Sequence, residues 1–232
     1  MDRLQRLEEN VKSIHQRCAN AAQSVGRDAT GVQLVAVTKY VDTEWTECVA
    51  EAGCHQLGES RPQQLWEKSA IWQGPDVAWH LIGHLQRNKV ARTLSIAHLI
   101  HAGDSMRLLK EINRHATETS PARVLVEVNI SGDSAKTGFS SEELPQALDE
   151  VAQLPHLIVC GLMAMASRDR RGDEARSDFS ALRELRDLCL PNCPGNVKLD
   201  ELSMGMSGDF EVAIEEGATI VRVGSAIFEG VV

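Results

Sequence analysis

The sequence predicts an α/β fold, a (β/α)8 barrel of the TIM type with an extra helix at its N-terminus. The first observation is an alternation of eight short apolar runs with segments of helical period, which indicates parallel βα units. The second is the stretch "VTKYVDTEW" after the first run. It contains no glycine, whereas an open doubly wound sheet normally has a Gly-rich phosphate loop there. The third is the length of 232 residues, close to the ~250 typical of a barrel.

The predicted elements follow one another along the chain without a linker. Residues 2–25 are amphipathic and rich in charge, so we expect a helix there, ended by Gly26. Predicted strands then cover residues 33–38, 55–58, 78–82, 99–101, 124–129, 157–163, 199–203 and 220–223. Predicted helices cover residues 44–51, 61–71, 88–95, 105–116, 142–153, 173–190 and 210–216. Because no repeat or Pro/Gly/Ser-rich stretch divides the chain, we expect a single domain over residues 1–232.

The composition limits the classes of partner. The chain is 43% hydrophobic, enough for a large core, and its net charge of -9 argues against binding to nucleic acid or to an anionic membrane. It has no run of about 18 apolar residues, and its N-terminal stretch is charged throughout, without the apolar region of a signal peptide. We therefore expect a cytoplasmic protein whose partners are small molecules or other proteins.

The cysteines and histidines do not follow the pattern of a metal site. The six cysteines are scattered and form no C-x-x-C pair, which is typical of reduced thiols. His80 and His84 lie four residues apart, but side chains at that spacing converge only on a helix. The surrounding "WHLIGHLQ" is typical of a strand leading into a loop. We therefore expect no bound metal.

The first strand ends on a candidate reactive residue. In a barrel the chemistry lies where strands end and loops begin, and "LVAVTK" ends on Lys39. An amine between a buried strand and a loop loses its proton readily when it is desolvated and then attacks a carbonyl, which is the chemistry of a Schiff base. The alternative is a solvated lysine without such a role, which is the commoner case for a strand-end lysine considered alone.

The ends of the last two strands favour an anion. Ser207 and Gly208 precede a helix that begins near Phe210, so backbone N–H groups and a hydroxyl point outward from a positive helix end. Gly224 and Ser225 offer the same groups after the last strand. Either turn alone is typical of ordinary helix capping. The two together, with a lysine on the first strand, are typical of the phosphate site in barrels of this class.

A lysine for a carbonyl, a cradle for a phosphate and Arg222 alongside describe pyridoxal 5'-phosphate (PLP). Six stretches also carry a resemblance to a known family and cover seven of the eight predicted strands in order: "LVAVTK", "LGESRPQQL", "WHLIGHLQRNK", "VLVEVNISGDSAKTGF", "GLMAMA" and "LSMGMSGDFEVAIEEGATIVRVGSAIF". In them the chain resembles the pyridoxal 5'-phosphate homeostasis protein family. The resemblance implies a fold type III barrel, like the N-terminal domain of alanine racemase but without its β-domain.

Carried over residue by residue, the resemblance implies a cofactor site at one mouth of the barrel. Lys39 would form the Schiff base with PLP, and Arg222 would face the pyridine nitrogen. The phosphate would be held by Ser207, Gly208, Gly224 and Ser225. The remaining cofactor-binding positions are Met204, Met165, Ser60 and His84, with the ordinary core as the alternative for Met165.

Further residues belong to the same signature stretches. Glu59, Gln86 and Asn88 lie in the loops after the second and third strands. The stretch "NISGDSAKTGF" contains Lys136, Gly138 and Phe139 in a polar loop that either closes on the pocket or forms an ordinary turn.

Two positions depart from the family pattern. Ser60 stands where the family commonly has Asn, so any contact made by that amide is lost, shortened or bridged by water. The chain ends "IFEGVV", where the family usually has I-F-G followed by a basic residue, and Glu229 changes the character of that segment. The second departure concerns the C-terminal cap and not the cofactor site, whose residues precede it.

Arg222 limits the chemistry that the resemblance implies. A guanidinium only donates hydrogen bonds and is effectively never deprotonated, so it leaves the pyridine nitrogen neutral and weakens the electron sink that amino-acid chemistry needs. The single tyrosine, Tyr40, adjoins Lys39 and is badly placed to act as an acid or base across the ring.

We therefore expect a protein that holds PLP on Lys39 and acts in vitamin B6 and amino-acid homeostasis without substantial catalysis. The alternatives are an amino-acid racemase of fold type III, a regulatory module that contacts another protein, and a barrel that binds no cofactor. Expected partners are PLP itself and PLP-dependent apoenzymes that would accept it. The resemblance implies a monomer.

Overall fold

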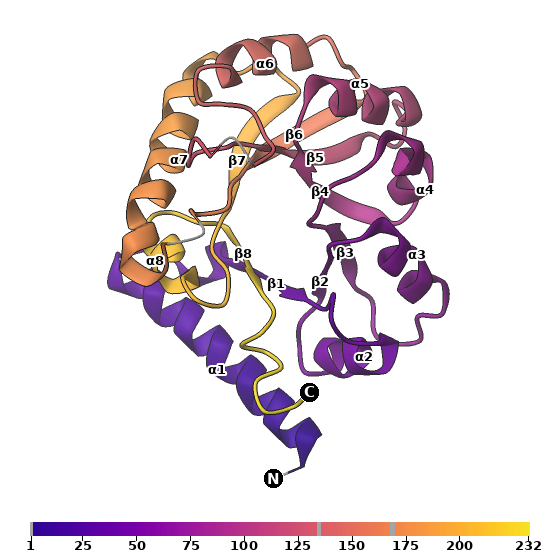
Figure 1. Ribbon diagram of the computed structural model, residues 1–232, viewed down its shortest axis with the longest axis vertical. Helices are drawn as coiled ribbons and strands as arrows, with labels where there is room; N and C mark the ends of the chain where they lie inside the picture. The colour runs from indigo at the N-terminus through magenta and orange to yellow at the C-terminus, as the bar shows by residue number, and fades with distance from the viewer. Residues whose placement is uncertain (1, 134–135, 168–169) are drawn as a thin grey trace.

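The computed structural model describes residues 2–133, 136–167 and 170–232, and its eight strands close into a parallel barrel in sequence order (Figure 1). The predicted barrel is therefore confirmed, and the doubly wound sheet is excluded. Residues 134 and 135 of the stretch "NISGDSAKTGF" lie outside the described residues. The strands are β1 Gln33–Val37, β2 Gln56–Glu59, β3 Ala78–Leu81, β4 Ala97–Gly103, β5 Ala122–Glu127, β6 Leu157–Met163, β7 Val197–Ser203 and β8 Ile220–Val223.

Helices surround the ring of strands (Figure 1). They are α1 Arg3–Ser24, α2 Thr43–Glu51, α3 Pro62–Ala70, α4 Val90–Leu94, α5 Met106–His115, α6 Leu144–Val151, α7 Arg176–Cys189 and α8 Phe210–Glu215. Two predicted helices are shorter than expected because 3-10 turns form their first residues, Arg87–Lys89 before α4 and Gly172–Ala175 before α7. In α6 a proline occupies the first turn, where its missing N–H costs no hydrogen bond.

Side chains along the strands alternate between two apolar clusters, as strand geometry requires. The smaller cluster fills the barrel and consists of Val35, Leu99, Ala102, Leu125, Cys160, Met163 and Ile220. The larger cluster lies between the strands and the helices and includes the intervening strand residues Leu34, Ala36 and Val221. A strand residue therefore points to the barrel axis or to the helices according to its place in this alternation.

The N-terminal helix packs against the end of the chain. Leu7, Val11 and Ile14 of α1 are buried, and α1 lies beside α8. The Asn10 side-chain amide donates hydrogen bonds to the carbonyls of Ile227 at 2.9 Å and Glu229 at 3.0 Å. Figure 1 shows both termini at the same end of the molecule. The unusual C-terminal segment is thus held by α1, away from the mouth of the barrel.

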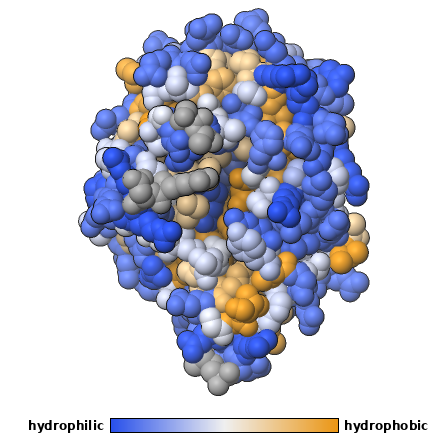
Figure 2. All heavy atoms as spheres, viewed as in Figure 1, coloured by the Kyte–Doolittle hydropathy of each residue, from blue (hydrophilic) through white to orange (hydrophobic). Residues whose placement is uncertain are grey.

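The surface, the helices and the metal-ligating side chains can be compared with the classes of partner that the sequence predicts. Figure 2 shows a mainly hydrophilic face with a hollow near its middle, above the barrel. Within the described ranges, no helix combines the length and the apolar character needed to cross a membrane. The same ranges contain no group of three His, Cys, Asp or Glu side chains that could hold a metal ion. All six cysteines, each of which lies in the described residues, are free thiols.

Candidate functional site

Lys39 lies in the turn after β1, at the carboxyl mouth of the barrel, and is half-buried. Val35 belongs to the inner cluster, so the alternation places residue 39 on the side of the barrel axis and Thr38 on the side of the helices. The Lys39 amine lies 4.9 Å from the ring centroid of Tyr40, which is 86% exposed. The amine is therefore accessible from the mouth, and Tyr40 lies beside it.

A buried ion pair holds the turn that carries Lys39. The Lys68 Nζ atom of α3 donates to Glu59 Oε1 at 2.6 Å and to the Thr38 carbonyl at 2.8 Å. The Thr38 hydroxyl donates to the same Glu59 oxygen at 2.7 Å, and Gln64 Nε2 donates to the Lys39 carbonyl at 3.3 Å. Glu59 thus points to the helices and not into the mouth. Sequence reasoning missed Lys68, although its spacing from Leu65 places it on the buried stripe of α3.

The loops after β7 and β8 bring backbone N–H groups together on one oxygen. Ser207 Oγ accepts from the Gly224 N–H at 3.2 Å and from the Ala226 N–H at 3.3 Å. A Cβ at Gly224 would lie 3.1 Å from the Val37 carbonyl oxygen, so glycine lets this loop approach β1 closely. At Gly208 a Cβ would meet nothing within 4 Å, so space is open beside the cradle.

The same β7 loop contains a buried carboxylate. The Asp209 side chain accepts from the Met206 N–H at 2.6 Å, and α8 begins at Phe210, as the sequence predicts. Burial raises the pKa of Asp209, while its hydrogen bond to Met206 and the charge of Arg222 act in the opposite direction.

Arg222 lies inside the barrel, in register with Val35 of the neighbouring strand β1. Its NH1 group donates to the Ser203 carbonyl at 2.8 Å and to Ser203 Oγ at 2.5 Å, and its NH2 group donates to the Ala164 carbonyl at 3.0 Å. Burial lowers its pKa to about 10, against the charges of Asp209 and Glu127, which raise it. The guanidinium therefore stays charged at neutral pH and is fixed by Ser203 at the end of β7 and by Ala164 directly after β6.

Glu127 is a second buried carboxyl group near Arg222, and sequence reasoning missed it. It ends β5 two residues after the inner-cluster residue Leu125, so it faces the barrel axis. Its Oε1 accepts from the Thr137 hydroxyl at 2.9 Å. Burial raises its pKa, and the charge of Asp104 acts in the same direction. The sequence signal was its position at the end of an apolar run, the same signal that identified Lys39.

The structure places the other candidate residues around this mouth or in the core. Met204 is fully buried in the larger core cluster, and Met165 is 42% exposed in the loop after β6. Lys136 donates to the carbonyls of Met165 at 3.2 Å and Ala166 at 2.9 Å, so it joins the loops after β5 and β6. The half-buried Ser60 lies against the β3 loop, and Ser225 is exposed.

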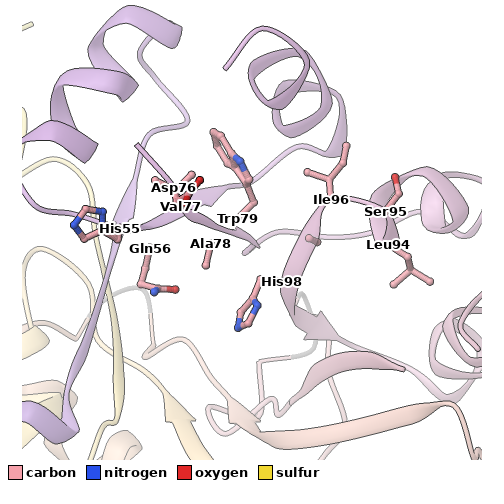
Figure 3. A pocket seen from close by; sticks show the side chains of 11 residues that line it. His55, Gln56, Asp76, Val77, Ala78, Trp79, Leu94, Ser95, Ile96 and His98 are labelled. Carbon is pink, nitrogen blue, oxygen red and sulfur yellow. The ribbon is translucent and has the colours of Figure 1, made fainter. Parts of the chain in front are cut away.

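Two cavities lie outside this arrangement of β7, β8 and β1. One, of about 470 Å³, is lined by His84, Gln86, Asn88 and Asp104 together with neighbouring residues, and the His84 Nδ1 atom lies 2.7 Å from Asp104 Oδ2. The other, of about 500 Å³, lies at the amino ends of β2, β3 and β4 (Figure 3). Lys39, Ser207, Gly208, Arg222 and Gly224 are thus together at one mouth, while His84 belongs to a separate cavity beside it.

Comparisons with known proteins agree with this geometry. Residues 3–230 match the family model described as alanine racemase, N-terminal domain. A pyridoxal phosphate homeostasis protein of Aquifex aeolicus is 37% identical over 221 residues, which are 95% of this chain and 96% of the relative. The protein of the same name from Pseudomonas aeruginosa is 36% identical, over 95% of this chain and 94% of the relative.

Solved structures also share both sequence and fold with this chain. PipY of Synechococcus elongatus, solved with PLP bound, is 30% identical and superposes with a TM-score of 0.80, over 93% of this chain and 99% of PipY.

Proposed function

The chain belongs to the pyridoxal phosphate homeostasis protein family, and from that premise we propose that it binds PLP at the mouth formed by β7, β8 and β1, covalently through Lys39. Its role is intracellular PLP and amino-acid homeostasis. The observation that carries the proposal is the convergence of the Gly224 and Ala226 N–H groups on one oxygen, beside a buried arginine and the lysine-bearing turn.

The residues present fit the groups of the cofactor. The two N–H groups that already donate to one hydroxyl oxygen would donate to a phosphate oxygen in its place, and the open side of Gly208 leaves room for the other phosphate oxygens. In the described part of the chain, three of the five N–H groups of Arg222 donate to protein atoms. The remaining donors suit the lone pair of a ring nitrogen.

The protein's own residues then have separate tasks. When bound, the cofactor supplies an aldehyde that an amine can attack and a ring that withdraws electrons. Lys39 contributes the amine, and the Lys68–Glu59 pair holds the turn on which that amine stands. Arg222 would present a charged donor to the ring nitrogen and offers no acceptor to a protonated one.

We propose that this site performs little catalysis. A ring nitrogen that faces a guanidinium stays unprotonated, which weakens the electron sink. Racemisation also needs an acid or base on the face of the ring opposite the lysine. Tyr40 does not meet that need, because its exposed ring lies at the Lys39 amine itself.

An amino-acid racemase is the second candidate, and Glu127 is the observation that favours it. In the eight-strand ring, β5 lies opposite β1, so this buried carboxyl faces the mouth from the side opposite Lys39 (Figure 1). The loaded protein should give only trace turnover of L- and D-alanine. Turnover of about 1–10³ per second that Glu127→Gln abolishes would instead establish the racemase.

Competition between two aldehydes tests the binding proposal. PLP and pyridoxal share the ring and the aldehyde, but only PLP carries the phosphate. We expect PLP to bind at least tenfold more tightly, since charge-assisted hydrogen bonds contribute about 1.5–3 kcal/mol each. Equal affinities in an absorbance titration would remove the N–H cradle from the site.

The proposal also covers the compartment of the protein and its partners. We propose the cytosol, because six unpaired cysteines are typical of a reducing compartment. PLP-dependent apoenzymes are the proposed acceptors, and the protein is proposed to act as a monomer. Size-exclusion chromatography coupled to light scattering tests the monomer, and transfer of PLP to a purified apoenzyme tests the acceptor class.

A further inference from the structure

A line of hydrogen-bonded side chains crosses the interior of the barrel. His80 Nε2 lies 2.8 Å from Gln56 Oε1, and His80 Nδ1 lies 2.9 Å from His101 Nε2. His101 Nδ1 lies 2.9 Å from Ser203 Oγ, which accepts from Arg222 NH1 at 2.5 Å. His80, His101 and Ser203 are fully buried. Side chains of β2, β3, β4 and β7 thus form one line that ends on the Arg222 guanidinium of β8.

The other end of this line reaches the opposite mouth of the barrel. Gln56 begins β2 and lines the cavity of about 500 Å³, together with Ala78 and His98. Figure 3 shows the Gln56 and His98 side chains on one side of the strands and the Trp79 ring on the other. The line therefore joins a cavity at the amino ends of the strands to Arg222 near their carboxyl ends.

The chemistry of the two ends gives the line one direction. A guanidinium can only donate, so Ser203 Oγ accepts from Arg222 and its own proton is free to go to His101 Nδ1. His101 then donates from Nε2 to His80 Nδ1, and His80 donates from Nε2 to the Gln56 carbonyl oxygen. If the hydrogen bonds ran in the reverse direction, His101 Nδ1 would donate to Ser203 Oγ, as Arg222 already does. The proton of the Ser203 hydroxyl would then have no acceptor in the line.

The direction also requires both imidazoles to be neutral. Burial lowers the pKa of His80 to about 3, and the charges of His98 and Arg123 act in the same direction. Burial likewise puts the pKa of His101 well below its usual range, with further lowering from His80 and Arg222. Around the Arg222 end, the facing carboxyl groups are Asp209 and Glu127. Each neutral ring has one donor and one acceptor, which is what a link in the line needs.

We propose that Gln56, His80, His101 and Ser203 are positioning residues, a relay that orients Arg222 against the cofactor ring nitrogen. The proposal rests on the proposed function, because it assigns Arg222 to that nitrogen. A hydroxyl that donates onward is a stronger acceptor, so each link strengthens the bond that fixes the guanidinium. The far mouth of the barrel is thereby coupled to the electronic state of the bound cofactor.

Two substitutions far apart in the barrel test the relay. Ser203→Ala removes the link next to Arg222, and Gln56→Leu removes the link at the opposite mouth. In the PLP-loaded protein, both should shift the pH midpoint of the cofactor's visible absorption band in the same direction. We expect about half a pH unit, roughly threefold in proton affinity, for Ser203→Ala and less for Gln56→Leu. Ser203→Thr, which keeps the hydroxyl, should restore the midpoint.

Matched controls separate the relay from general loss of packing. Cys160→Ala removes a buried side chain from the same interior without removing a member of the line, and Ser95→Ala changes a second residue of the Gln56 cavity. Both should leave the midpoint at the wild-type value. If the loaded Ser203→Ala and Gln56→Leu proteins also keep the wild-type midpoint, the relay is overturned.

A measurement on the unaltered chain tests the direction even if a variant does not fold. Histidine nitrogen-15 resonances of the wild type should show His80 and His101 as neutral rings with the proton on Nε2. A proton on Nδ1 of either ring, or a charged ring, at neutral pH overturns the relay. Unloaded protein serves for this measurement. A failure to bind PLP would therefore contradict the proposed function alone, whereas a wrong tautomer would contradict the relay alone.

Discussion

Ser207 shows how one hydroxyl can mark an anion site. Its oxygen accepts from two backbone N–H groups of the next loop, Gly224 and Ala226, and so occupies the place that we propose for a phosphate oxygen. Arg222 is a second informative residue, because its charge is buried and three of its N–H groups donate to Ser203 and Ala164. The placement of both residues near this mouth was predictable from sequence, since Ser207 lies in the loop after β7 and Arg222 lies near the end of β8.

A charge placed at Ser207 should weaken cofactor binding. Ser207→Asp puts a carboxylate where the phosphate belongs and removes a hydrogen-bonding hydroxyl, so we expect a loss of about 10- to 100-fold in PLP affinity. Ser95→Asp makes the same change of charge at the opposite end of the barrel and should leave the affinity unchanged. Titration of the absorption band measures both, and equal losses would mean that net charge and not the cradle is responsible.

Neutralising Glu127 should stabilise the fold. Its pKa is raised by burial, so the folded state holds its proton more tightly than the unfolded state and loses stability as pH rises above about 4.5. Glu127→Gln removes that loss and still accepts from Thr137. The free energy of unfolding at pH 7 should rise by roughly 1.4 kcal/mol per unit of raised pKa, the melting temperature should rise with it, and the gain should vanish near pH 4. The exposed Glu142→Gln is the control, and a lower melting temperature at pH 7 would contradict this account.

At the scale of elements, the contact between β2 and α3 positions Lys39, the lysine that we propose binds PLP. Glu59 and Lys68 form an ion pair that is almost entirely buried, at 2.6 Å, and Lys68 also binds the Thr38 carbonyl at the end of β1. Three elements thus meet under the turn of Lys39. The sequence predicts a strand that ends at Gly58 and so puts Glu59 in the following loop, whereas Glu59 is the last residue of β2. Whether a residue at a strand end points to the barrel axis or to the helices depends on where the alternation starts, and the sequence does not give that exactly.

Breaking this pair should cost more than breaking an exposed one. Lys68→Met leaves the Glu59 carboxylate buried without its partner, so we expect a loss of about 3–5 kcal/mol in the free energy of unfolding. Lys110→Met breaks the exposed pair with Glu150 and should cost under about 1 kcal/mol. Urea unfolding measures both. Lys68→Met should also reduce PLP loading, and the pair substitution Glu59→Leu with Lys68→Met should recover most of the stability.

At the scale of the whole molecule, the alternation of apolar runs and helical segments was sufficient to predict the closed barrel. Strand direction and neighbour order follow from βα units, which explains why the site residues of β1, β7 and β8 could be placed together. The relay could not be predicted. His80 and His101 meet because of the register between β3 and β4, which shifts at Trp79/His80, and an apolar pattern does not encode a register shift.

The buried histidines should make the fold sensitive to acid. Both imidazoles are neutral in the folded state and take up protons near pH 6.5 when unfolded, so stability falls as pH drops below 6.5. At pH 5 the expected loss is about 2 kcal/mol for each histidine. Urea unfolding at pH 7 and pH 5 measures it. The raised pKa values of Glu127 and Asp209 act in the opposite direction. A free energy of unfolding that stays level over this range in the Glu127→Gln variant would contradict two neutral rings in the core.

Borohydride reduction of the PLP-loaded protein tests the central claim most directly. Reduction fixes the cofactor to the amine that holds it, and digestion followed by mass spectrometry identifies the peptide. We expect one modified peptide, the one that contains Lys39, and no fixed cofactor in Lys39→Ala, while Lys136→Ala labels like the wild type. A full visible band in Lys39→Ala, or label on the Lys136 peptide of the wild type, would contradict the assignment of the site.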